Sequence, residues 1–199
     1  PKEISLAVSK PAEGVTQRAI MTTDDDQKIK VLLDQIQHRQ EYNSILVFTS
    51  KKSSVSFIVR HLKRAKISAA GLSSNLEQKD REEVLRKYRS KGIRVLVATD
   101  VMSRGIDIKE INMVINFDVP SDAEDYVHRI GRTARAKTKG EAVTFINDKD
   151  IPKVWRIERL IEASIPKEQP SEAIGVGPEW REKSKSSNSK KRRFKKKRR

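Results

Sequence analysis

Short apolar runs alternate with amphipathic segments along most of this chain, and that alternation restricts the fold more than any other feature. The runs are rich in β-branched residues, and the segments between them carry apolar residues at helical spacing. Strands are predicted at 15–21, 45–48, 67–70, 95–98, 113–117 and 142–146. Strict alternation produces right-handed βαβ units. The sequence therefore predicts an α/β fold, a doubly wound and mostly parallel sheet with helices on both faces.

Three local signals place the ends of the predicted helices. The acidic cluster 23–26 offers caps for a helix that continues to Ile36. Ser121 and Glu124 have the spacing of a capping box, which predicts a helix from there to about residue 130. Pro152 is tolerated in the first turn of a helix over 151–161.

Composition divides the chain into three parts. Residues 1–14 lack periodicity and are interpreted as a linker or arm, and 15–165 as one folded domain. Residues 166–199 are predicted to be a disordered basic tail, because the last ten residues include nine Lys and Arg. We expect the tail to tether RNA electrostatically; a solubilising or targeting run is the alternative.

Several classes of function are excluded or made improbable by what the sequence lacks. It has no Cys, which removes disulfides and thiolate chemistry, and its three His lie far apart, which argues against a zinc site. No apolar run approaches the ~20 residues of a membrane span, so we expect no membrane partner and a soluble, cytoplasmic protein. The chain begins at Pro1 without Met, which we interpret as a piece of a longer or processed protein.

Polar residues follow the predicted strands where ligands collect in open parallel sheets. Thr49 follows one run, Thr99 and Asp100 another, and Asp118 a third. Hydroxyls donate to phosphate oxygens, so these positions suit the close approach of a phosphate group. The alternative is that such residues merely cap the next helix.

The segment 128–135 concentrates basic residues, with Arg129, Arg132 and Arg135 at a spacing of three. Along a helix they would lie near one side, and like charges so close favour a compensating anion. Guanidinium groups bind phosphate bidentately and suit a phosphoryl-transfer transition state. The alternative is a solvated basic face.

Together these residues carry a resemblance. The segment 99–107, Thr-Asp-Val-Met-Ser-Arg-Gly-Ile-Asp, and the segment 128–135, His-Arg-Ile-Gly-Arg-Thr-Ala-Arg, resemble the C-terminal RecA-like lobe of a DEAD-box RNA helicase. The runs 45–50 and 116–120 and the pair Gln78 and Arg81 match in the same order. The resemblance covers about 15–163, and the basic tail is similar to that of the bacterial RhlE-like branch.

The resemblance implies roles for individual residues. Arg132 and Arg135 match arginine fingers that reach the γ-phosphate of ATP, and Gly105 and Asp107 match nucleotide-binding positions. His128 and Arg129 match positions that link the two lobes. The RNA-binding row is Thr49, Arg81, Thr99 and Asp100. Two positions depart from the family pattern: Ala134 replaces Gly, and 73–75 is Ser-Ser-Asn where His-Gly-Asp is frequent.

The chain carries no phosphate-loop motif and no Asp-Glu-Ala-Asp sequence. ATP and Mg²⁺ would therefore be held mainly by a missing N-terminal RecA-like lobe of the same polypeptide. We predict a lobe that closes on ATP and grips RNA, and that is inactive as an ATP hydrolase on its own. The alternative is a non-catalytic RNA-binding or annealing module on a RecA-like scaffold.

Overall fold

The computed structural model describes residues 14–103, 111–133 and 139–183. Its strands form one parallel sheet in the order β3-β4-β2-β5-β6-β1-β7. The strands are β1 (Val15–Met21), β2 (Ile45–Phe48), β3 (Ala69–Leu72), β4 (Val95–Ala98), β5 (Met113–Asn116), β6 (Gly140–Ile146) and β7 (Lys167–Glu168). Because β2, β4 and β5 are buried along their whole length, they are continuous apolar runs rather than alternating ones. The predicted doubly wound α/β fold is confirmed.

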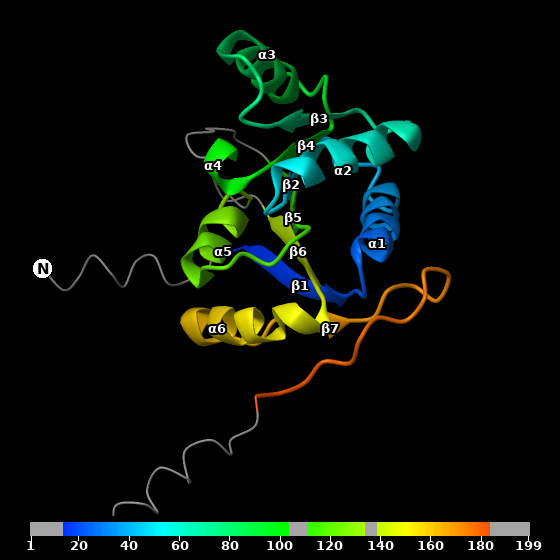
Figure 1. Cartoon of the computed structure of the whole chain (residues 1–199), viewed down its shortest axis with the longest axis vertical. Helices are drawn as coiled ribbons and strands as arrows, with labels where there is room; N and C mark the ends of the chain where they lie inside the picture. Colours follow the sequence, from blue (N-terminus) through cyan, green and yellow to red (C-terminus); the bar gives the residue numbers. More distant parts are fainter. Residues whose placement is uncertain (1–13, 104–110, 134–138, 184–199) are drawn as a thin grey trace, which may run out of the picture.

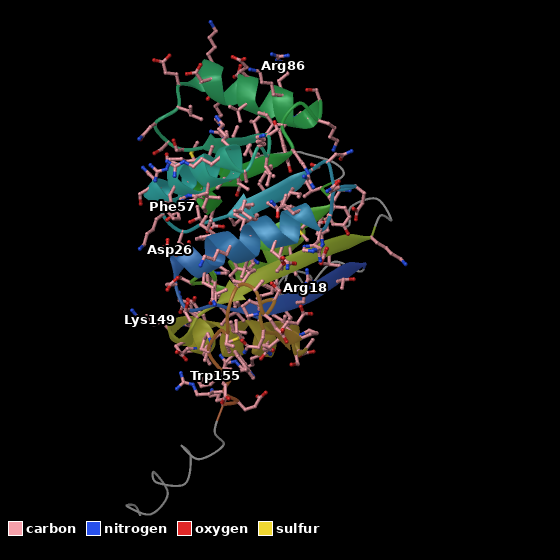
Figure 2. All side chains as sticks on the ribbon, turned by 90° about the vertical axis from the view of Figure 1, so that its right-hand side faces the viewer. Arg18, Asp26, Phe57, Arg86, Lys149 and Trp155 are labelled. Carbon is pink, nitrogen blue, oxygen red and sulfur yellow. The ribbon has the colours of Figure 1, made fainter. Side chains whose placement is uncertain are left out.

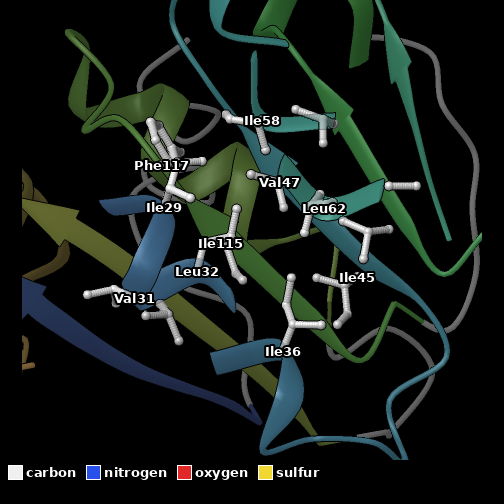
Figure 3. Packing of buried hydrophobic residues seen from close by; sticks show 14 of the residues in the cluster. Ile29, Val31, Leu32, Ile36, Ile45, Val47, Ile58, Leu62, Ile115 and Phe117 are labelled. Atoms are coloured by element: carbon white, nitrogen blue, oxygen red, sulfur yellow. The ribbon is translucent and has the colours of Figure 1, made fainter. Parts of the chain in front are cut away.

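Helices cover both faces of the sheet (Figure 1). They are α1 (Asp25–Gln37), α2 (Lys52–Arg64), α3 (Gln78–Arg89), α4 (Asp100–Ser103), α5 (Ala123–Ile130) and α6 (Ile151–Ile161), with a 3-10 turn, η1 (Asp148–Asp150), before α6. One core lies between the sheet and α1 and α2, where Leu32, Ile58 and Leu62 pack on the central strands (Figure 3). On the opposite face α3 covers one half of the sheet and α5 with α6 the other.

The helix starts show which local signals were correct. Asp24 caps α1 by accepting a hydrogen bond from the Gln27 N–H at 2.8 Å, as the acidic cluster predicted. The capping box at Ser121 was wrong by one residue. Asp122 is the cap of α5 and accepts from the Glu124 N–H at 3.0 Å. A carboxylate directly before the first turn takes that donor, so the helix begins at Ala123.

The ordered fold continues beyond residue 165, where the sequence predicted a tail. β7 pairs with β1, and the Ala19 N–H donates to the Pro166 carbonyl at 2.8 Å. The chain then loops beside α1 and returns past α6 (orange in Figure 1). A Cβ on Gly177 would come within 2.2 Å of the Met21 carbonyl oxygen, so only glycine allows this segment to lie so close to β1. The sequence did not predict this segment, because its composition is polar and several of its contacts use backbone atoms, such as the Gly175 carbonyl that accepts from the Gln27 side chain.

The two tryptophans take part in this closing segment. The indole N–H of Trp155 donates to the Arg181 carbonyl at 3.0 Å, and the Lys167 ammonium lies 4.1 Å from the centroid of the Trp180 ring. Both rings are partly buried and pack against the core cluster that α5 and α6 form with the sheet. Within the described ranges, no helix has the length and apolarity to cross a bilayer.

Candidate functional site at the carboxyl ends of the strands

The register of the sheet brings the predicted strand-end residues to one edge. Phe48 lies beside Ala98 on one side and Asn116 on the other, so the residues that follow β2, β4 and β5 are neighbours. The Thr49 N–H donates to the Ala98 carbonyl at 3.1 Å, which extends the pairing by one step. Thr49, Thr99 and Asp118 are therefore adjacent because short parallel strands end together.

Arg129 is a buried cation at the centre of this edge. Its side chain is 2% exposed, and its Nε and Nη2 atoms both donate to the Asp100 carboxylate at 2.6 Å. Nη1 donates to the Asp118 carbonyl at 2.9 Å and to the Asn116 side-chain oxygen at 3.2 Å. The guanidinium also lies 5.1 Å from the centroid of the Phe48 ring. Arg129 thus ties α5 to the ends of β4 and β5.

Arg129 and Arg132 do not share one side of a helix, although their spacing of three would place them so along a continuous helix. α5 ends at Ile130, so Arg132 follows in a turn and cannot continue the side on which Arg129 lies. Arg129 points inward, and the anion that compensates its charge is Asp100 of this same domain. Arg129 therefore does not belong to a solvated basic face.

A second buried pair lies next to the first. The Lys28 ammonium, on a residue that is 2% exposed, donates to Asp118 Oδ1 at 2.9 Å. Asp118 Oδ2 accepts from the Thr49 hydroxyl at 2.7 Å and from the Ser50 N–H at 2.9 Å. Burial raises the pKa of Asp118, but the Lys28 charge and these hydrogen bonds outweigh it, so the pKa lies below its ordinary value. Through Asp118, α1 is joined to the end of β2.

A cavity of 490 Å³ opens at the side of this network, beside α5. Asp122, Glu124 and Asp125 line it near the start of the helix, and His128 and Arg132 line it near the end. Acidic side chains therefore line one end of the cavity, and we call the other end, formed by His128 and Arg132, the basic wall. Arg129 and Asp100 also line the cavity, where they are paired with each other. The basic wall is a suitable place to receive an anion.

The four residues of the predicted RNA-binding row lie along the same edge but are not equally accessible. Arg81, on α3, reaches the α4 turn, where its Nη2 donates to the Met102 carbonyl at 3.3 Å. Thr99 is mostly buried and Thr49 is completely buried. Because the Thr49 hydroxyl is bound to Asp118, Thr49 orients the chain that enters α2 rather than offering a hydroxyl at the surface. Asp100 is partly exposed beside Arg129.

Three of the predicted site residues lie outside the described ranges. They are the nucleotide-binding positions Gly105 and Asp107 and the second finger, Arg135. The described part of the predicted nucleotide site therefore consists of Arg132, with His128 and Arg129 beside it.

Sequence reasoning missed Lys28 and the side chain of Asn116. Lys28 precedes Leu32 and Ile36 at a spacing of four, so it lies in line with the buried stripe of α1. A Lys within such a stripe indicates a buried charge that needs a partner. Asn116 is the last residue of an apolar run; its side-chain nitrogen donates to the Thr144 hydroxyl at 3.0 Å, and its oxygen accepts from Arg129.

Comparison with known proteins places the chain in a family. The family described as "Helicase conserved C-terminal domain" matches residues 27–137, which is more than half of the chain. The ATP-dependent RNA helicase DBP8 of Yarrowia lipolytica is 41% identical over 127 residues, and the ATP-dependent RNA helicase eIF4A of Lodderomyces elongisporus is 33% identical over 153. The matched regions are 64% and 77% of this chain but only 29% and 38% of those proteins.

Solved structures give the same result. Escherichia coli SrmB, a DEAD-box protein solved in complex with a regulator of ribonuclease activity, has a TM-score of 0.74 and 30% identity; the match covers 85% of this chain and 98% of that one. Saccharomyces cerevisiae Dbp5, solved with RNA and ADP BeF3, has a TM-score of 0.75 and 25% identity, over 82% of this chain and 44% of that one. The chain belongs to the helicase conserved C-terminal domain family, as a C-terminal domain of the DEAD-box RNA helicases.

Proposed function

We propose that this chain is a lobe of an ATP-dependent RNA helicase, and that it closes on bound ATP and binds RNA. The observation that carries the proposal is the cavity beside α5, where Arg132 and His128 form a basic wall and the pair of Arg129 and Asp100 also lines the cavity. A positioned guanidinium at the carboxyl edge of a parallel sheet suits charge that develops on a transferred phosphoryl group. Relatives named as ATP-dependent RNA helicases support the same function.

In this proposal Arg132 and Arg135 act as arginine fingers toward ATP held by an N-terminal lobe. Gly105 and Asp107 contribute to the nucleotide site, and His128 and Arg129 act where the lobes meet. ATP, when bound, supplies the phosphoryl group. Mg²⁺ belongs to the other lobe in this scheme, and the described residues contain no cluster of His, Asp and Glu that could hold a metal ion.

The RNA half of the proposal rests on the same edge of the sheet. Arg81, Thr99 and Asp100 border it, and Arg81 is held beside the α4 turn. We assign Thr49 a positioning role, because its hydroxyl is bound to Asp118 and its neighbour Ser50 is exposed at the approach to α2. Dbp5 solved with RNA supports RNA as the ligand class.

The basic tail adds an electrostatic tether for RNA. Residues 181–199 contain 12 Lys and Arg and one Glu, which is most of the net charge of +16. Neutralised phosphates release counterions, so the tail should add affinity with little sequence preference. Membership of the RhlE-like branch rests on this tail alone and stays a prediction.

The proposal is tested by measuring ATP hydrolysis with and without RNA for two proteins, the 199-residue chain and the full polypeptide that includes its N-terminal lobe. We expect no turnover from the chain alone, because the groups that bind the phosphates lie on the other lobe. RNA should stimulate turnover by the full polypeptide. Arg132-dependent hydrolysis by the chain alone, or a full polypeptide indifferent to RNA, would contradict the proposal.

A further inference from the structure

A groove runs between α2 and the edge strand β3, and its floor is aliphatic. The groove has a volume of 630 Å³, and Val55, Val59 and Leu76 contribute its apolar surface. Gly71 of β3 lies beneath the helix: a Cβ there would come within 2.5 Å of Val55 Cγ1 and 3.4 Å of Val59 Cγ2. Any larger residue would fill this space or push α2 away. Because Gly71 has no side chain, α2 can lie close to β3 and the floor of the groove stays unfilled.

One side of the groove is lined by a basic rim, which we define as Arg60, Lys63 and Arg64. Their spacing of three and four places them together on one side of α2, and all three are exposed. None of their side chains has an ion pair or hydrogen bond to any residue in the described ranges. The described residues that line the groove include no Asp or Glu, so the charge of the basic rim is not neutralised locally.

The groove is separate from the candidate site described above. It shares no lining residue with the cavity beside α5. Figure 2 shows α2, marked by Phe57, and α3, marked by Arg86, with the edge of the sheet between them. Phe57 packs against the core on the α1 side of α2, whereas Val55 and Val59 also line the groove.

We propose that this groove docks an acidic amphipathic segment of a partner protein. Apolar side chains of that segment would fill the floor over Gly71, and its carboxylates would pair with the basic rim. A helix in a groove buries an apolar face in this way and gains specificity from charges along one side. RNA fits less well, because single strands bind through aromatic platforms as well as charge, and the described lining residues are aliphatic, small or basic.

The test is a selection from a random peptide library displayed on phage, with the 199-residue chain as bait. We expect enriched peptides that combine acidic residues with Leu, Ile or Phe. A synthetic copy of the most enriched peptide is then titrated against variants by fluorescence anisotropy. The double substitution Arg60→Glu/Lys63→Glu and the single substitution Val59→Glu should each weaken binding about tenfold or more.

The matched control is Lys30→Glu/Arg156→Glu, which makes the same change in net charge at exposed positions on α1 and α6. It should leave peptide affinity within about twofold, because those positions lie outside the groove and distant surface charges are screened by salt. Circular dichroism and urea unfolding establish that each variant is folded. A single-stranded RNA oligonucleotide is titrated in parallel, and the two double variants should weaken its binding equally.

Two results would overturn the proposal. One is the absence of an acidic and apolar consensus, or a consensus peptide whose binding is insensitive to the groove variants. The other is RNA binding that falls much further in the rim variant than in the control variant, which would assign the groove to RNA. None of these results depends on ATP hydrolysis, so the test of the groove is independent of the proposed function.

Discussion

Basic residues in two regions of this domain have opposite environments. At the strand ends Arg129 and Lys28 are almost completely buried, and each is bound to a carboxylate. On α2 the basic rim is exposed and has no ionic partner among the described residues. Removal from water is costly for a charge unless it is paired, whereas an exposed charge has no such cost. The buried cations therefore hold the strand-end residues in place, and the exposed cations on α2 are available to a ligand.

The largest effect on stability is expected from Arg129→Ala. Removing the guanidinium leaves Asp100, Asn116 and the Asp118 carbonyl without their shared donor. We expect the free energy of unfolding to fall by about 3 kcal/mol, since breaking a buried ion pair leaves the partner charge buried and uncompensated. Urea denaturation of the 199-residue chain measures this, with Arg86→Ala on the exposed face of α3 as the control. Equal losses for the two variants would show that the strand-end network is not structural.

A smaller effect is expected from Asp118→Asn, and it should depend on pH. The pKa of Asp118 is lowered in the folded protein, so its ionised form stabilises the fold above the unfolded pKa of about 3.9, and this contribution is lost as the pH falls through the folded pKa. At neutral pH the variant should lose about 1–3 kcal/mol. The difference from wild type should shrink below about pH 4. A constant difference across the acid range would contradict this origin.

The smallest effect on stability is expected on α2. Arg60→Ala and Lys63→Ala should each change the free energy of unfolding by no more than about 0.5 kcal/mol, because neither side chain has a folded-state partner in the described residues. The same urea series measures both. A loss as large as that of Asp118→Asn would mean that the basic rim has a structural role and would remove the contrast with the strand ends.

Most of the fold could be predicted because its signals are local. The apolar runs of β2, β4 and β5 are continuous in sequence, and helix α6 begins and ends at the predicted residues. The order of strands and the closing segment 167–183 could not be predicted in the same way. β7 is two residues long, and its pairing with β1 depends on backbone contacts that carry little composition signal.

The position of the candidate residues at the strand ends could be predicted, but the contacts between their side chains could not. The strand-end positions Thr49, Thr99 and Asp100 follow from the rule that ligands collect where parallel strands end. The partners of Arg129 do not, because Asp100 lies 29 residues away and Asn116 lies 13 away. The different directions of Arg129 and Arg132 depend on where α5 ends. Arg129 lies on the buried side of the helix, and Arg132 follows the last helical residue, Ile130.

The most direct test of the account is the turnover number for ATP in the full polypeptide carrying Arg132→Ala. Arg132 lines the cavity rather than the core, so the variant should stay folded and bind ATP nearly as well as wild type. Because a positioned arginine acts mainly on the phosphoryl-transfer transition state, kcat should fall by about 10³ to 10⁵, with Arg132→Lys recovering only part of it. A variant that keeps nearly normal kcat would contradict the assignment of this cavity to ATP hydrolysis.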